Sequence, residues 1–233
     1  MSDVAVTDWI ADLPAPTAEP GRFRIGGEAH KRLFCRTLLE THNPYKPTVI
    51  DWPELPADAR QRLVSLPIWD IAVQTEGKAS LNVASYADLV SDDPWLRRAV
   101  ELNAFEEARH KRVLANLVAA YGIALAPEPP YSTPRDREWA FMVTGFSECI
   151  DSFFAFGLFE TAKRSGFFPE ELVDTFEPVI QEEGRHILFF VNWVAWRRAN
   201  MALWKRPWFE LRVMAVWLFL LWERIGIARS IDG

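Results

Sequence analysis

A five-residue phrase occurs twice in this chain, as EEARH at residues 106–110 and as EEGRH at residues 182–186. Each copy lies within a long stretch of helical apolar spacing, and residues three apart on a helix share one face. The second Glu and the His of each copy therefore project side by side, where they can hold a metal ion together. Two of the four histidines fall at matching places in the two copies. We expect the chain to fold around a buried site for two metal ions.

Four long helices are expected to carry this site, because apolar residues recur with helical spacing and proline or glycine marks the ends. Asp93 can cap the second helix with Pro94 at its first position, and Gly122 ends it. Thr133 is expected to cap the third helix, and Pro178 to kink the fourth helix or loosen its hydrogen bonding. The expected ranges are 67–90, 94–121, 133–166 and 169–201. Because no pattern of parallel strands is present, the predicted fold class is all-α.

The remaining segments flank this bundle within one domain, since 233 residues of which 49% are apolar can bury a large core. The expected divisions are a flexible arm at 1–27, a helix and extended strap at 28–66, the four-helix bundle at 67–201 and a C-terminal aromatic helix in 202–233. Helices in the flanking segments are expected at 28–42, 57–66 and 208–228. Prolines interrupt both the arm and the strap.

The register of the paired helices can be tested from sequence, because each helical residue rises about 1.5 Å. Residues equally far from the turn between two antiparallel helices stand at the same level. Glu76 and Glu107 are equally far, within one residue, from the turn near residue 92. Glu148 and Glu183 are placed in the same way about residue 166. Glu160 lies only six residues before that second turn, roughly 18 Å from the level of Glu148, so we reject it as a ligand.

One Glu from each of the first and third helices would thus meet a Glu and a His from each of the second and fourth. The six predicted metal ligands are Glu76, Glu107, His110, Glu148, Glu183 and His186. Four carboxylates offset the charge of two divalent or trivalent ions, whereas four buried Glu side chains without metal would be very costly. The alternative is a solvated face of ion pairs. Apolar residues at core spacing around Glu76, Glu107 and Glu183 favour the metal site.

The two EExRH phrases, the sequence TGFSE at 144–148 and the order of the helices resemble the soluble di-iron oxidase branch of the ferritin-like superfamily. The nearest local likeness is to acyl-carrier-protein desaturases, and it covers about residues 67–201. It implies a ferritin-like four-helix bundle with a di-iron centre that activates dioxygen. A manganese–iron or dimanganese pair would suit the same ligands. The strap and the C-terminal helix lie outside the resemblance, and the chain is short for a full desaturase.

The same resemblance implies that the acid before each ligand Glu supports a ligand His of the other phrase. The implied pairs are Glu106 with His186 and Glu182 with His110. Such a bond satisfies the second ring N–H of a metal-bound imidazole and fixes its tautomer. Arg109 and Arg185 would neutralise these two acids. The alternative is that Glu106 and Glu182 are merely solvated.

Two hydroxyl groups lie one helical turn either side of Glu148 and are candidate catalytic groups. Thr144 and Ser152 would manage protons during oxygen activation, although most helical hydroxyls only bond to their own backbone. Asp151 is a further candidate acid beside the ligands. Phenylalanines of the third helix indicate either an apolar channel to the metals or an aromatic core. These are Phe146, Phe153, Phe154, Phe156 and Phe159, with Gly145, Ala155 and Gly157 between them.

Together these residues predict an enzyme, a di-iron oxidase or oxygenase that uses dioxygen to hydroxylate or desaturate an apolar small molecule or a carrier-bound acyl group. An external donor such as a ferredoxin would supply electrons. One alternative is iron oxidation or peroxide detoxification, as in ferritins and rubrerythrins. Another is a metal-binding bundle without turnover. The strap, the C-terminal helix and the aromatic third helix exceed what a minimal storage bundle needs, and they favour the oxidase.

Composition limits location and partners. The formal net charge of −6 gives no basic surface for nucleic acid. Two cysteines, Cys35 and Cys149, and the lack of a basic-then-apolar leader favour a reducing, cytoplasmic location. No stretch reaches the roughly 18 to 20 uncharged apolar residues that cross a bilayer.

The C-terminal helix has two interpretations. Its aromatic and basic residues are Trp204, Trp208, Trp217 and Trp222 with Lys205, Arg206, Arg212 and Arg224. They could lie on a membrane surface. They could equally cover the bundle or contact a partner in a homodimer, and we favour this covering role.

Overall fold

The structure is a computed structural model that describes residues 8–14 and 23–231, apart from the side chains of residues 152–155, 227, 230 and 231. Throughout this described part the chain forms helices and no strand. The all-α class is therefore confirmed. Residues 1–7 and 15–22 of the expected N-terminal arm lie outside the described residues.

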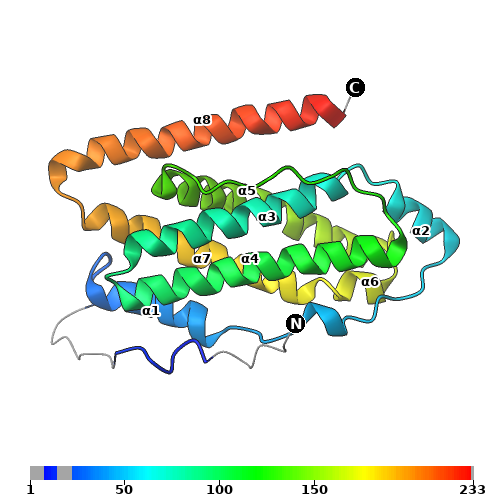
Figure 1. Ribbon diagram of the computed structural model, residues 1–233, viewed down its shortest axis with the longest axis horizontal. Coiled ribbons are helices and arrows are strands. Elements are labelled where there is room, and N and C mark those ends of the chain that lie inside the picture. The colour runs from blue at the N-terminus through cyan, green and yellow to red at the C-terminus, as the bar shows by residue number, and fades with distance from the viewer. Residues whose placement is uncertain (1–7, 15–22, 232–233) are drawn as a thin grey trace.

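Four long helices of the described chain form a bundle (Figure 1). They are α3 Trp69–Ala87, α4 Pro94–Tyr121, α5 Arg137–Ser165 and α7 Glu177–Ala199. α3 and α4 form an antiparallel hairpin joined by the short helix η2, Asp88–Val90. Tyr86 near the end of α3 stacks on Phe141 near the start of α5, with ring centroids 4.4 Å apart. α5 therefore runs parallel to α4, and α7 returns antiparallel to α5.

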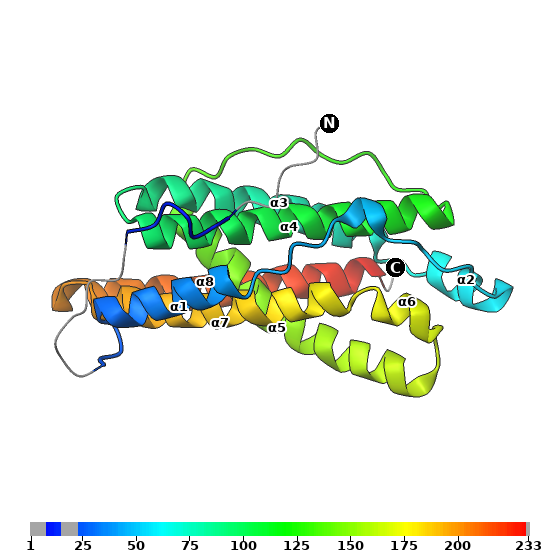
Figure 2. The ribbon, with the colours of Figure 1, turned by 90° about the horizontal axis from the view of Figure 1, so that it is seen from below.

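The connection between α4 and α5, residues 123–136, returns along the length of the bundle (Figures 1 and 2). α4 has 28 residues and is roughly 42 Å long. The 14 connecting residues reach roughly 46 Å when fully extended. The connection must therefore be almost fully extended, and its prolines favour such backbone. They are Pro127, Pro129, Pro130 and Pro134.

Local capping explains where the helices begin and end. Asp93 accepts a hydrogen bond from the Leu96 amide at 3.0 Å, and Gly122 ends α4 in the left-handed region with φ 68°, both as predicted. The prediction that Thr133 caps the third helix is wrong. Asp136 caps it instead, accepting from the Trp139 amide at 2.9 Å, because residues before it remain in the extended connection.

The fourth bundle helix is interrupted rather than kinked. The structure divides the expected range 169–201 into α6, Glu170–Asp174, and α7, Glu177–Ala199. Pro178 lies in the first turn of α7, where its missing N–H leaves no hydrogen bond unmade. A continuous helix would have needed that N–H.

Three further helices flank the bundle: α1 Glu28–Glu40, α2 Ala57–Val64 and α8 Arg206–Ile231. α1 packs against α4 and α7 (Figure 2), and α8 packs against α5. Within the expected flexible arm, Trp9 lies against Phe105 with ring centroids 5.6 Å apart, so this described part of the arm contacts the bundle.

The bundle core has two apolar clusters with a polar layer between them. Along α4, residues 95–104 belong to the first cluster and residues 117–121 to the second. Glu107 and His110 lie between these two stretches. One described helix, α5, is long and apolar enough by composition to span a membrane, with a mean hydropathy of 1.3. Its Glu148 lies in the polar layer.

Candidate metal centre

The structure brings the six predicted ligands into two adjoining groups in this polar layer. One group is Glu76, Glu107, His110 and Glu183, and the other is Glu107, Glu148 and His186. Within each group the candidate ligand atoms lie within 4.8 Å of one another. Glu107 belongs to both groups, so its carboxylate lies where it can bridge two ions. The rejected Glu160 is exposed and pairs with Arg164 at 2.6 Å.

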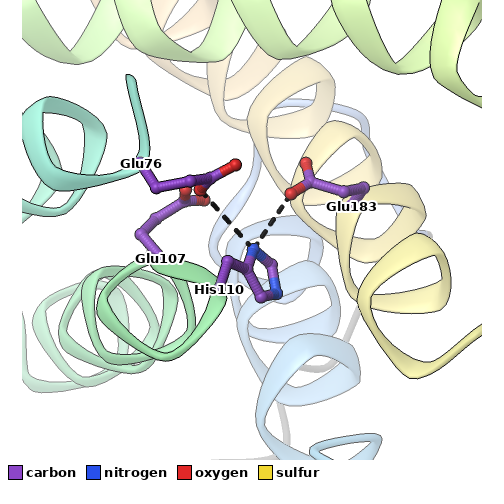
Figure 3. Close-up of side chains that lie close together, drawn as sticks. All are labelled: Glu76, Glu107, His110 and Glu183. Atoms are coloured by element: carbon purple, nitrogen blue, oxygen red, sulfur yellow. Dashed lines mark ion pairs between the residues drawn. The ribbon is translucent and has the colours of Figure 1, made fainter. Parts of the chain in front are cut away.

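Each imidazole turns one nitrogen towards the carboxylates. His110 Nδ1 lies 3.0 Å from a Glu183 oxygen and 3.8 Å from a Glu76 oxygen (Figure 3). His186 Nδ1 lies 2.9 Å from Glu107 Oε1. The two rings are 5.7 Å apart between centroids. The groups are therefore close enough to act as one centre.

The other nitrogen of each imidazole bonds to an acid from the opposite phrase. His110 Nε2 lies 2.8 Å from Glu182, and His186 Nε2 lies 2.8 Å from Glu106. These are the two pairs that the resemblance implies. Because a carboxylate accepts the Nε2 proton, the neutral ring keeps its lone pair on Nδ1 and directs it into the centre.

The atoms that face the centre fit metal ions. Among the described residues, neither Nδ1 has a hydrogen-bond partner of good geometry, nor has Glu107 Oε1, although all three atoms are buried. A ring lone pair that faces carboxylate oxygens at 2.9–3.0 Å is repelled unless a proton or a cation lies between them. Imidazole nitrogen and carboxylate oxygen are ligands for iron, manganese and zinc. These residues can therefore hold metal ions.

The charge of the site also suits bound cations. Arg109 forms an ion pair with Glu182, and Arg185 donates to Glu106 at 2.7 Å. Six carboxylates and two guanidinium groups leave four negative charges, which two divalent cations would neutralise. The arginines thus neutralise the supporting acids and leave the inner carboxylates for cations.

Protons would take the place of cations when none is bound. Burial, together with the charge of Glu107, raises the pKa of Glu76 and of Glu148 well above the ordinary value. Burial alone would lower the pKa of His110 and His186, but their contacts with carboxylates outweigh it and hold each pKa well above the ordinary value. Metal binding must therefore displace protons from these side chains.

Two residues of the strap region complete the site and were not predicted as part of it. His42 Nδ1 lies 2.6 Å from Glu106, and the Tyr45 hydroxyl donates to Glu182 at 3.4 Å. The Arg109 guanidinium lies 4.0 Å from the Tyr45 ring centroid, and burial raises the pKa of Tyr45 to about 12. The strap has no repeating pattern that would have revealed these contacts.

A chamber of about 460 Å³ opens onto the carboxylates. Its aliphatic wall comprises Ile71, Ala79, Val143, Val179 and Ile180. Charged side chains that reach solvent line its mouth, and they are Lys78, Asp151, Glu223 and Arg224. Glu76 is 21% exposed through this side, whereas Glu107 is 2% exposed. A small molecule in the chamber would therefore approach the centre from the side of Glu76.

Thr144 and Asp151, two of the predicted catalytic and supporting residues, lie in different environments. Thr144 is buried, lines the chamber and accepts a hydrogen bond from Asn82 at 3.2 Å. The side chain of Ser152 lies outside the described residues. The prediction that Asp151 supports the ligands is wrong, because it is exposed and instead accepts hydrogen bonds from Ser147 and Arg224.

Of the predicted phenylalanines, Phe146 belongs to the core rather than to a channel, whereas Phe156 and Phe159 are half-buried. Phe146 packs against Phe190 and Trp217, with ring centroids 4.9 and 5.3 Å away. The space beside Gly145 is filled by the Phe190 ring. Phe153, Phe154 and Ala155 lie outside the described side chains.

No family model matches this chain, and neither a curated protein nor a solved structure does.

Proposed function

We propose that this chain is a ferritin-like di-iron oxidase or oxygenase that uses dioxygen to oxidise an apolar substrate held in the chamber. One observation carries the proposal: two histidine–carboxylate groups share Glu107, and each turns an unbonded imidazole Nδ1 inward. The single long connection between α4 and α5 supports it, because ferritin-like bundles have one such crossover.

Each part of the centre has a role in this proposal. One ion would be held by Glu76, His110 and Glu183, the other by Glu148 and His186, and both by Glu107. Iron in this site would supply the redox chemistry that dioxygen requires. Glu106 and Glu182 orient the two imidazoles through Nε2 and increase their basicity.

The chamber wall selects the substrate. An aliphatic wall favours an apolar small molecule or an acyl chain. Thr144 Oγ1 already accepts from Asn82, which leaves its own proton available to a group in the chamber. Electrons would come from an external donor such as a ferredoxin.

Iron loading without oxygen, followed by exposure to oxygen, tests the function. We expect the chain to bind two Fe²⁺ ions and then to consume dioxygen, because both ligand groups are preformed. Glu107→Gln should bind less iron and consume less dioxygen, since it removes the carboxylate that both groups share. Glu170→Gln, a change at an exposed residue of α6, is the matched control and should behave as wild type.

Two outcomes would contradict the oxidase. An iron-loaded chain that consumes no dioxygen would have no such activity. Uptake of many iron ions per chain, with oxidation of the iron alone, would favour iron storage instead.

A further inference from the structure

Helix α8 is apolar on two opposite faces. The inner face packs against α5, beside which α8 runs in Figure 1. This face buries Phe209, Val216 and Leu220. The opposite face carries a row of exposed large side chains, which we name the outer ridge. It consists of Trp208, Leu211, Leu218, Leu221, Trp222 and Ile225. At 100° per residue these six lie on one side of the helix.

The outer ridge is too large and too continuous to be ordinary protein surface. Residues 208–225 extend over roughly 26 Å of helix. Leu218 and Trp222 are 61% and 72% exposed. Within this stretch the Glu210 carboxylate forms an ion pair with Arg198 of α7 at 2.6 Å, so its charge is neutralised beside the ridge. An exposed apolar surface of this extent marks a contact with another surface.

Positive charge bounds the outer ridge at both ends. Lys205 precedes it, and Arg229 follows it. Arg206 turns away from it and donates to the Ala199 carbonyl oxygen at 3.2 Å. Arg212 and Arg224 do not contribute, because they turn inward and pair with Asp136 and Asp151 on α5. The chain as a whole carries a net charge of −6, so the cations at the ridge ends are opposite in sign to the molecule.

A second copy of this chain is a poor partner for the outer ridge. In a two-fold dimer the same surface contacts itself. If two α8 helices paired antiparallel, Lys205 of one copy would face Arg229 of the other. If they paired parallel, the Lys205 residues of the two copies would face each other. Both arrangements bring like charges together.

We propose that the outer ridge docks on the surface of an anionic phospholipid membrane. Tryptophan and leucine side chains would enter the boundary between headgroups and acyl chains, and Lys205 and Arg229 would contact the phosphates and acidic headgroups. α8 would lie on the membrane surface, because its inner face is already packed against α5. The apolar ridge and the charges at its ends thus match the two layers of a membrane surface.

Docking would bring the chamber mouth within about 10–12 Å, one helix diameter, of the membrane surface. Glu223 and Arg224 line the chamber from the inner side of α8, and the exposed Trp222 and Ile225 lie on the opposite side of the same helix. If the docked chain is the proposed oxidase, its substrate is an apolar molecule dissolved in the membrane. This assignment of the substrate rests on the proposed function. The docking itself does not depend on that function.

Sedimentation of the full chain with vesicles tests the docking. Vesicles of phosphatidylserine with phosphatidylcholine should carry the wild-type protein down and shift its tryptophan fluorescence to shorter wavelengths. The double variant Leu218→Gln, Leu221→Gln should bind at least about tenfold more weakly, because it removes two apolar anchors that are 61% and 59% exposed. The matched control Leu33→Gln, Leu89→Gln changes residues that are 54% and 55% exposed on other elements, and it should bind as wild type.

Charge is tested separately. Lys205→Gln with Arg229→Gln should weaken binding to the anionic vesicles by about tenfold or more and leave any binding to pure phosphatidylcholine unchanged. A wild-type chain that sediments with neither vesicle would overturn the proposal. So would a wild-type dimer that becomes monomeric in the Leu218, Leu221 variant without any vesicle binding. Because sedimentation needs no iron and oxygen consumption needs no vesicles, failure of one leaves the other intact.

Discussion

Arg109 and Arg185 tie the supporting acids to the segment that follows α1. Arg109 pairs with Glu182 and donates to the Asn43 carbonyl oxygen at 2.7 Å. Arg185 repeats the pattern on the other side, bonding to Glu106 and to the last turn of α1. Removing one partner of a buried ion pair is far more damaging than removing a surface pair. The two arginines therefore hold both the acids and the strap in place.

The Glu148 carboxylate should matter both for metal binding and for stability without metal. Glu148→Gln should remove one of two bound metal ions, because an amide cannot supply the negative charge of the carboxylate. Without metal the same variant should be at least as stable as wild type, because burial raises the pKa of Glu148 and its ionised form is costly. Metal content per chain and the Tm without metal check both statements.

Glu160→Gln on the same helix is the matched control. Glu160 is exposed and pairs with Arg164, so both its metal content and its Tm should equal those of wild type. Equal metal content in the Glu148 and Glu160 variants would remove Glu148 from the centre.

At the level of elements, the approach of α5 to α7 depends on a glycine. The Phe190 ring of α7 occupies the space where a side chain at Gly145 of α5 would lie. Phe190 also packs against Phe141 and Trp193, with ring centroids 5.7 Å away in both cases, so the ring has little room to move. The close approach brings Glu148 of α5 to the level of His186 of α7.

Two identical substitutions in α5 should therefore have opposite effects. Gly145→Ala should lower the free energy of unfolding by about 1–3 kcal/mol, because the new methyl group overlaps the Phe190 ring. Gly157→Ala meets no atom within 4 Å and should raise it by about 0.5–1 kcal/mol through helix propensity. Urea unfolding of both variants gives the two values. A Gly145→Ala protein as stable as Gly157→Ala would contradict this packing.

At the level of the whole molecule, the polar layer divides the core and makes stability depend on what neutralises it. Two apolar clusters enclose the centre from both ends of the bundle. Buried carboxylates in this position are stable only with protons or cations beside them. Metal binding at this layer would therefore be linked to folding and to proton uptake.

This linkage has a definite sign. Without metal, the folded pKa values of Glu76, Glu148, His110 and His186 lie above their ordinary values of 4.5 and 6.5. The folded state thus binds more protons than the unfolded state, so the contribution of the site to stability falls as pH rises between the ordinary and the raised pKa values. Metal affinity changes in the opposite direction, because the ligands must be deprotonated.

The difference in Tm between metal-loaded and chelator-treated protein should therefore widen as pH rises from about 5.5 to about 8. Saturating metal at about one hundred times its Kd adds about 2.7 kcal/mol per site, which gives a shift of several degrees. Thermal unfolding with and without chelator measures it. A difference that stays constant or narrows with pH would show that the linked groups are not the ligands.

Much of the centre follows from spacing along the chain. The repeated phrase places Glu107 with His110 and Glu183 with His186, because helical periodicity is a local property. Distances from the turns identify Glu76 and Glu148, because helical rise is constant. The all-α class and the capping of α4 by Asp93 also depend on neighbouring residues alone.

The tertiary structure decided what depends on contacts between distant segments. The parallel course of α4 and α5, the bonds of His42 and Tyr45 to the supporting acids and the diversion of Asp151 to Arg224 all join residues that no local pattern connects. The same holds for the outer ridge of α8, since an apolar helix does not reveal which of its faces another helix will cover. Periodicity specifies each helix and its level, whereas packing alone selects its neighbours and the side chains that remain exposed.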